Sequence, residues 1–366
     1  MRAKWSSSSG RGTSTLDSTS TWPGCCYSWD TGFGSSRAVG GSGSRPRVDG
    51  VADARGSRAR RVVGILFAAA ALGFLGLFVV ENLEEVRAHP WSVRPGLLLL
   101  SILINVASLS WGVRVWQLVL RRLAVAVRFL PLARVWFLSS LGRYIPGKVW
   151  QFVGAAHLGG LIGIQAAVVV TSLAVHTAFF LLGALLVAVY LLPAPVGELG
   201  GVPIEAIRWM TPLLILLAHP AVIGGGLRLV RRVTGAAVAD WRGNLMDGAA
   251  LALLSAVGWC VSGLAFFLFV LSLTPLPSSA LGGIVGANAL AFVVGYVVFI
   301  APAGLGVKEA ALTALLAFYV PAPVAALLAV AARLWMVAAE ILPALALLRA
   351  PAPSGIDADA HGRVET

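Results

Sequence analysis

Residues 141–150 read LGRYIPGKVW and lie between long apolar runs of the chain. Proline has no backbone N–H and disfavours helix at the residue before it, while glycine adopts backbone conformations that other residues resist. We therefore expect the helix to break near Pro146 and Gly147, at or near membrane depth. Broken backbone is tolerated at that depth only where protein or a water-filled cavity covers it. The stretch also carries two cations, Arg143 and Lys148, so the break brings positive charge into such a place.

A second stretch, in the other half of the hydrophobic region, has the same features. Residues 301–309 read APAGLGVKE and combine a proline, two glycines, a lysine and a glutamate. Paired Pro/Gly interruptions in the two halves of a membrane chain point to the binding site of a transporter. We predict that the two breaks face each other and hold an anionic lipid head group.

Composition sets the broad class of the protein. The 366 residues are 58% hydrophobic and 12% charged, whereas a soluble domain is about half apolar and a quarter charged. Apolar runs of about 20 residues recur, so we predict an all-α, polytopic helical membrane protein with about seven or eight spans and two Pro/Gly-broken or re-entrant segments. The net charge of +12 does not indicate a nucleic-acid partner, because the basic residues concentrate in the N-terminal region and in short loops that orient spans.

The chain divides into three regions by composition. Residues 1–61 are rich in Ser, Gly and Arg and show no helical or strand period, so we expect a disordered basic tail. The alternative is an over-extended start, with the true beginning near Val51. Residues 62–349 form the predicted transmembrane domain, and residues 350–366 form a short C-terminal tail.

Positive charge near the spans sets their orientation. Arg58, Arg60 and Arg61 precede the first apolar run and place the N-terminus in the cytoplasm of a plasma-membrane protein. Residues 307–319 are a short helix: if it completes a crossing the C-terminal tail is cytoplasmic, and if it only dips the tail is external. Residues 135–163 are interpreted as a re-entrant hairpin or discontinuous helix. The predicted spans cover residues 62–80, 95–120, 165–192, 211–227, 247–273, 279–300 and 323–348.

The second break offers an anion site at the start of a helix. Gly304 and Gly306 precede a helix that begins near Val307, and the free N–H groups and positive dipole end of such a helix attract an anion. Lys308 adds a full positive charge. The simpler interpretation of Glu309 is that it caps this helix.

The first break offers a second clamp. Arg143 and Lys148 are expected to contact the anion, or else to act only as anchors on the cytoplasmic side. Tyr144 and Trp150 are amphipathic aromatic residues that suit the head-group level of a membrane.

The last span carries two charges on nearly one helix face, Arg333 and Glu340. A charge within a span costs several kcal/mol unless it pairs or meets water, which makes both residues functional candidates. We predict that Arg333 pairs with Glu309 and that Glu340 pairs with Lys308, with a purely structural ion pair as the alternative. The predicted head-group site comprises Arg143, Tyr144, Pro146, Gly147, Lys148, Pro302, Gly304, Gly306, Lys308, Glu309, Arg333 and Glu340.

Other polar residues on apolar segments are given structural roles. His157 and His176 are interpreted as making core or interhelical hydrogen bonds rather than relaying protons, and Asn105 and Asn288 as interhelical hydrogen-bonding residues. The sequence contains no metal-ligand spacing, phosphate-cradling nucleotide loop or nucleophile–base set. We therefore predict no metal, no cofactor and no catalytic residue, and we do not expect an enzyme.

The two broken stretches also carry a family resemblance. The runs GRYIPGKVW (142–150) and PAGLGVKEA (302–310) resemble the two signatures of the lysylphosphatidylglycerol synthase transmembrane family, also called flippase-like, over about residues 62–348. The second signature usually has glycine where this chain has Ala303. The resemblance implies a multi-pass plasma-membrane protein that moves, or helps to move, a charged or glycosylated lipid between leaflets. Full-length synthases continue into a soluble aminoacyl-transferase domain, for which the residues after Leu348 are too few, so synthase activity is not expected.

Three functions follow from these observations. The first is a lipid flippase or lipid transporter, whose partner is an anionic, aminoacylated, glycosylated or polyprenyl-phosphate lipid. The second is a non-catalytic accessory subunit of a membrane glycosyltransferase or of a cell-envelope assembly system. The third is an intramembrane enzyme acting on a lipid phosphate with Glu309 or His157 as acid/base, and it is disfavoured because the sequence has no compact His-bearing motif.

Overall fold

The computed structural model of the chain describes residue 73 and residues 76–144, 150–193, 208–209, 211–235, 240–297 and 306–349. Within these ranges every regular element is helical and no strand is present. Five helical segments are long and apolar enough to cross a bilayer, as predicted for a helical membrane protein. They are α3 (Pro95–Arg122), α6 (Ala166–Leu191), α10 (Leu245–Leu273), the continuous η4–α11 segment (Ser278–Val297) and α13 (Ala322–Arg349).

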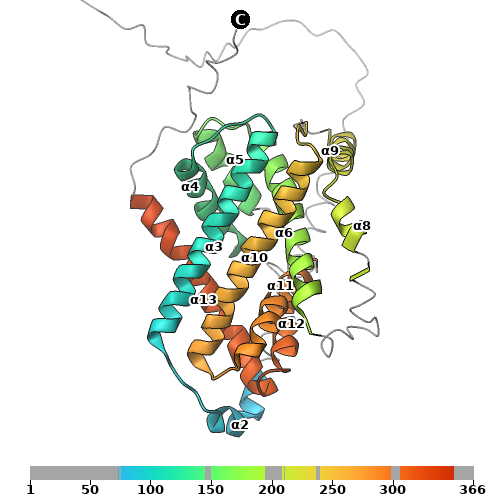
Figure 1. The fold of residues 1–366 in the computed structure, drawn as a ribbon. Helices are drawn as coiled ribbons and strands as arrows, with labels where there is room; N and C mark the ends of the chain where they lie inside the picture. Colours follow the sequence, from blue (N-terminus) through green and yellow to red (C-terminus); the bar gives the residue numbers. More distant parts are fainter. Residues whose placement is uncertain are drawn as a thin grey trace, which may run out of the picture. The chain divides into compact units, whose positions relative to one another are not determined.

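Shorter helices connect and flank these long ones (Figure 1). They are α2 (Leu83–Ala88), α4 (Phe129–Ser140), η1 (Leu141–Tyr144), α5 (Trp150–Leu161), α8 (Thr211–Leu216), α9 (Pro220–Thr234) and α12 (Val307–Leu316). Within the long η4–α11 segment, η4 covers Ser278–Ala280 and α11 covers Leu281–Val297. The two predicted tails, over residues 1–61 and 350–366, and most of the first predicted span, over residues 62–80, lie outside the described residues.

α3 and α10 lie side by side and antiparallel (Figure 1). At one end, Arg122 Nη2 lies 2.6 Å from Asp247 Oδ1, and the backbone N–H of Arg242 donates to the Arg122 carbonyl at 3.0 Å. Asp247 and Asn244 also form a reciprocal capping box that starts α10. We call this the arginine end, because α3 finishes here with Arg121 and Arg122.

The opposite end of the pair is closed by the segment between α2 and α3. The backbone N–H of Ser92 donates to the Leu273 carbonyl at 3.0 Å, and the His89 ring lies 2.6 Å from the Thr274 hydroxyl. We call this the α2 end, because α2 immediately precedes these contacts. Fastening at both ends fixes the register of α3 against α10 along their whole length.

α4 and α5 form a hairpin that opens at the arginine end. Leu120 of α3, Val127 just before α4 and Ile164 just after α5 belong to one buried apolar cluster, so the hairpin begins and ends at the same level. Near the tip, Gly142 lies against the backbone of Trp150, where an added Cβ would stand 3.0 Å from the Trp150 carbonyl carbon. The structure therefore shows an antiparallel hairpin over the predicted segment 135–163, and its re-entrant position in a membrane stays a prediction.

α11 and α12 form a second hairpin, which opens at the α2 end. Gly283, near the start of α11, lies against the ring of Tyr319, just after α12. Gly295, near the end of α11, lies against Lys308 at the start of α12, where an added Cβ would stand 2.8 Å from Lys308 Cβ. The two helices are therefore antiparallel, and the chain after α12 is back at the end where α11 began.

The two halves of the protein follow one plan in opposite directions. α3 runs from the α2 end to the arginine end, the α4–α5 hairpin enters from the arginine end, and α6 leads away from it. α10 runs from the arginine end to the α2 end, the α11–α12 hairpin enters from the α2 end, and α13 runs to the arginine end, where Ala344 packs in the cluster of Leu120. Inverted repeats with interrupted helices at their interface are a common plan of secondary transporters.

The predicted span over residues 211–227 is two helices, α8 and α9, rather than one. Pro220 occupies the first helical position of α9, where its missing N–H has no helical partner to lose. The ring of His219 caps the same helix by accepting from the Ala221 N–H at 3.2 Å. The chain has already reached the start of α10 at Ala218, whose carbonyl lies against α10. The segment that leads back to the start of α10 therefore ends near Ala218, earlier than the predicted end at residue 227.

The opposed hairpins predict opposite labelling of two engineered cysteines. In a chain whose native cysteines are replaced by serine, Phe318→Cys, just after α12, should react from the side of the α2 end, and Arg232→Cys, on α9, from the side of the arginine end. Both side chains are exposed, and Glu84→Cys on α2 is the matched control for the α2 end. An impermeant maleimide added to vesicles of known orientation measures the sidedness. Labelling of Phe318→Cys and Arg232→Cys from the same side would contradict the hairpin.

Candidate functional site

A cavity of about 350 Å³ lies between the two hairpins and the long helices. Its lining residues on α3, α6, α10 and α13 come from the middle part of each helix, so the cavity lies at mid-depth in the bundle. Arg143 faces it from the first hairpin, and Lys308 and Glu309 face it from the second. The described parts of both hairpins therefore share one hollow. The Pro/Gly breaks at residues 145–149 and 301–305 lie outside the described residues, so the prediction that they face each other stays a prediction.

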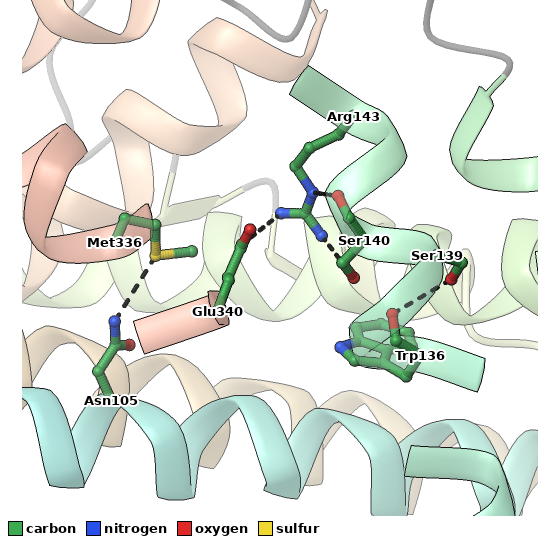
Figure 2. Close-up of polar contacts among 7 residues, drawn as sticks. All are labelled: Asn105, Trp136, Ser139, Ser140, Arg143, Met336 and Glu340. Atoms are coloured by element: carbon green, nitrogen blue, oxygen red, sulfur yellow. Dashed lines mark hydrogen bonds and ion pairs between the residues drawn. The ribbon is translucent and has the colours of Figure 1, made fainter. Parts of the chain in front are cut away.

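Arg143 connects the first hairpin to α13 (Figure 2). Its Nη1 donates to Glu340 Oε1 at 2.9 Å, while Nε and Nη2 donate to the carbonyl and hydroxyl oxygens of Ser140 at 3.1 Å each. The Glu340 side chain is only 2% exposed. The sequence predicted Lys308 as the partner of Glu340; Arg143 occupies that place because η1 extends α4 far enough to carry the guanidinium to α13.

Glu309 connects the second hairpin to the same helix. Its Oε1 lies 3.1 Å from Nη1 of Arg333, and its Oε2 accepts from the backbone N–H of Gly306 at 2.8 Å. Gly306 has a φ of 83°, a backbone conformation that glycine adopts without strain. The predicted pairing of Arg333 with Glu309 is confirmed, and so is the capping role of Glu309, because one carboxylate serves both.

Lys308 lines the cavity without an ion-pair partner among the described residues. Its Nζ lies 5.9 Å from the centre of the Phe292 ring, which is within the range of a cation–π contact. The absence of a side chain at Gly295 leaves the space that the Lys308 stem occupies. The ammonium group is thus held at the cavity with much of its hydrogen-bonding capacity unused by the described part of the chain.

The charges that line the cavity do not cancel. Arg143 and Arg333 each neutralise one glutamate, and Lys308 remains, so the described lining carries one net positive charge. A charge in a medium of low dielectric constant acts more strongly than the same charge in water. The arrangement therefore favours a ligand with one net negative charge.

The rest of the cavity wall is largely aromatic. Phe180 of α6, Trp259 of α10 and Phe292 of α11 meet with ring centres 4.7 to 5.4 Å apart. The Phe292 ring also lies next to Lys308. The charged and the aromatic parts of the lining therefore adjoin at this residue, and the cavity is amphiphilic.

The structure locates part of the predicted head-group site. Five of its charged residues line the cavity: Arg143, Lys308, Glu309, Arg333 and Glu340. The backbone N–H of Gly306 donates to the carboxylate of Glu309. Only the backbone of Tyr144 is described, at the end of η1. The remaining predicted residues lie outside the described ranges: Pro146, Gly147, Lys148, Pro302 and Gly304.

Two polar residues that were given structural roles face the cavity. His176 is 2% exposed and Asn288 is 6% exposed, and both contribute to the lining. By contrast, His157 on α5 is exposed and lies away from the cavity lining, and Asn105 donates to the Met336 sulfur at 3.6 Å, between α3 and α13 (Figure 2). In the sequence, each of these residues is a lone polar residue on an apolar helix. That pattern is the same for a residue in the core and for a residue that lines a cavity, so the sequence could not distinguish the two.

Comparison with known proteins adds no family assignment. A scan of protein-family models finds no match to the chain, and a search of curated proteins finds none either. The site must therefore be interpreted from its own chemistry.

The pair between Arg143 and Glu340 predicts a large coupling in stability. Arg143→Met or Glu340→Leu alone should destabilise the protein by about 3–5 kcal/mol, because each removes one member of an ion pair at mid-depth and leaves the charge of the other. The double variant should lose much less than the sum, since both charges are gone. Thermal unfolding of the detergent-solubilised protein measures all three. The exposed pair Arg231–Asp240, with its atoms 3.5 Å apart, is the matched control and should show little coupling; strictly additive effects at Arg143 and Glu340 would contradict the prediction.

Proposed function

We propose that the protein is a lipid flippase or lipid transporter that moves an anionic lipid between the leaflets of the plasma membrane. The observation that carries this proposal is the position of Lys308. It is a cation without an ion-pair partner among the described residues, in a mid-depth cavity shared by the tips of two opposed hairpins. The head group of the lipid binds there through its phosphate.

The cost of charge in a bilayer supports a ligand-binding role. A charged side chain at the centre of a span is retained where it pairs, meets water or serves a pathway. Of the three cations among the described lining residues, two have glutamate partners, so pairing accounts for them. Lys308 has no such partner in the described part of the chain, and an anionic ligand supplies one.

The size of the cavity is consistent with a head group. Ligand pockets typically hold about 300–1,000 Å³, and the cavity of about 350 Å³ is near the lower end of that range. This volume suits a phosphate and a small polar group. The hydrocarbon chains of the lipid remain in the bilayer while the head group occupies the cavity.

The opposed hairpins supply a route from both sides. In transporters built of inverted repeats, a fixed mid-depth site opens to one side and then to the other as one repeat moves against its mate. Here one hairpin leads from the cavity to the arginine end and the other to the α2 end. Movement at either hairpin would open the same site to a different leaflet.

Charge distribution supports an orientation. The arginine end carries Arg121, Arg122, Arg231 and Arg232, and basic residues gather on the cytoplasmic side. We place that end, the C-terminal tail and the N-terminus in the cytoplasm, with residues 62–80 as an additional span. The prediction of seven or eight spans counted α11 and α12 as two separate crossings. If each hairpin is instead a re-entrant segment, the number of full crossings is lower.

Lipid translocation in reconstituted vesicles tests the proposal. Lys308→Met keeps the length of the side chain and removes its charge, so transport of a fluorescent phosphatidylglycerol should fall by about tenfold or more. Arg121→Met, which removes a charge from an exposed position at the arginine end, is the matched control and should transport normally. Unchanged transport by Lys308→Met would contradict the assignment of the anion site. Absence of transport by the native protein would favour the accessory-subunit alternative instead.

A further inference from the structure

The aromatic part of the cavity carries two polar groups that no described residue satisfies. His176 Nε2 is buried and has no hydrogen-bond partner, and no described hydrogen bond involves the side-chain amide of Asn288. Both residues line the cavity. A buried polar atom without a partner is costly, so a ligand that supplies the missing partner gains affinity.

The unpartnered nitrogen of His176 calls for a group that can donate or accept. In a neutral imidazole one ring nitrogen donates a hydrogen bond and the other accepts one. A hydroxyl can do either, so a ligand hydroxyl is a suitable partner for His176 Nε2 in both tautomers.

The two polar groups flank the same pair of rings. His176 precedes Phe180 by four residues on α6, and Asn288 precedes Phe292 by four residues on α11, so each pair lies on one helix face. The rings of Phe180 and Phe292 are 5.4 Å apart, and His176 stacks on Phe180 at 5.9 Å. Lys308 Nζ lies 5.9 Å from the centre of the same Phe292 ring. All three polar groups line one cavity, so a ligand whose anion contacts Lys308 can place its adjoining group near His176 and Asn288.

The charges of the lining argue against an amine on that group. Both lining glutamates are already paired with arginines, and the net charge of the described lining is positive. A cationic head group would find no carboxylate without an arginine partner among the described lining residues. The Phe292 ring, which could otherwise attract a cation, already lies beside Lys308.

We infer that the lipid carried by this cavity is a singly charged phosphodiester whose head group bears hydroxyls and no amine. This inference rests on the proposed function and specifies its substrate class. The hydroxyls exchange hydrogen bonds with His176 Nε2 and with Asn288, while the carbon skeleton of the head group packs on Phe180 and Phe292. Both phosphatidylglycerol and a polyprenyl phosphohexose have this chemistry.

Equilibrium binding to the full-length protein in detergent, measured by native mass spectrometry, tests the inference. The key comparison is phosphatidylglycerol against phosphatidylmethanol, which has the same charge and no head-group hydroxyl. We expect phosphatidylglycerol to bind about three- to tenfold more tightly, the worth of one or two hydrogen bonds. Lysyl-phosphatidylglycerol and phosphatidylcholine should bind more weakly than phosphatidylglycerol. A polyprenyl phosphohexose in a parallel titration shows which source of the shared head-group chemistry is preferred.

Variants separate this inference from the proposal beneath it. His176→Phe keeps a ring and removes Nε2, so phosphatidylglycerol should bind as phosphatidylmethanol does; Asn288→Leu gives an independent reading, and His157→Phe is the matched control. Lys308→Met should weaken both lipids equally. Equal binding of the two lipids by the native protein, or tighter binding of either amine-bearing lipid, overturns the inference while leaving the Lys308 effect intact. Binding that is indifferent to Lys308→Met overturns the anion site itself.

Discussion

Two ion pairs with buried carboxylates connect α13 to both hairpins, and α13 supplies the glutamate of one pair and the arginine of the other. α13 presents Glu340 to Arg143 of the first hairpin and Arg333 to Glu309 of the second. Neither carboxylate is tolerated at mid-depth without its cation, because the cost of an unpaired charge there exceeds that of most other defects. The pairs therefore tie the described part of each hairpin to α13. Among the described residues that line the cavity, Lys308 is the charge that remains once the pairs are made.

The inverted order of long helix, hairpin and long helix brings a hairpin to mid-depth from each side of the bundle, which is the plan of many secondary transporters. In the function that we propose, Lys308 selects the charge of the ligand. His176 and Asn288 on the aromatic wall select its head-group chemistry. Because both hairpins are tied to α13 by ion pairs, we propose that movement of one hairpin is coupled to movement of the other.

Much of the site could be predicted because charges and broken helices are rare in apolar runs. Arg143, Arg333 and Glu340 were identifiable from sequence position alone, and helical spacing placed the last two on one face. The partner of Glu340 could not be identified from the sequence, because it depends on the relative depth of two segments that are 197 residues apart in the chain. The aromatic wall was missed because large apolar side chains have the same pattern whether they face lipid, core or cavity. The error over residues 211–227 was avoidable, because Pro220 already indicated a new helix start.

The most direct test of the central claim is to identify the lipid that stays with the purified protein. The account predicts that mass spectrometry of the native chain, extracted in mild detergent, finds an anionic phospholipid at close to one per protein. It predicts that Lys308→Met loses this lipid and that Arg121→Met retains it. Equal retention by both variants, or a native protein that carries only zwitterionic or neutral lipid, would contradict the claim that two hairpin tips and a surplus lysine form an anion site within the membrane.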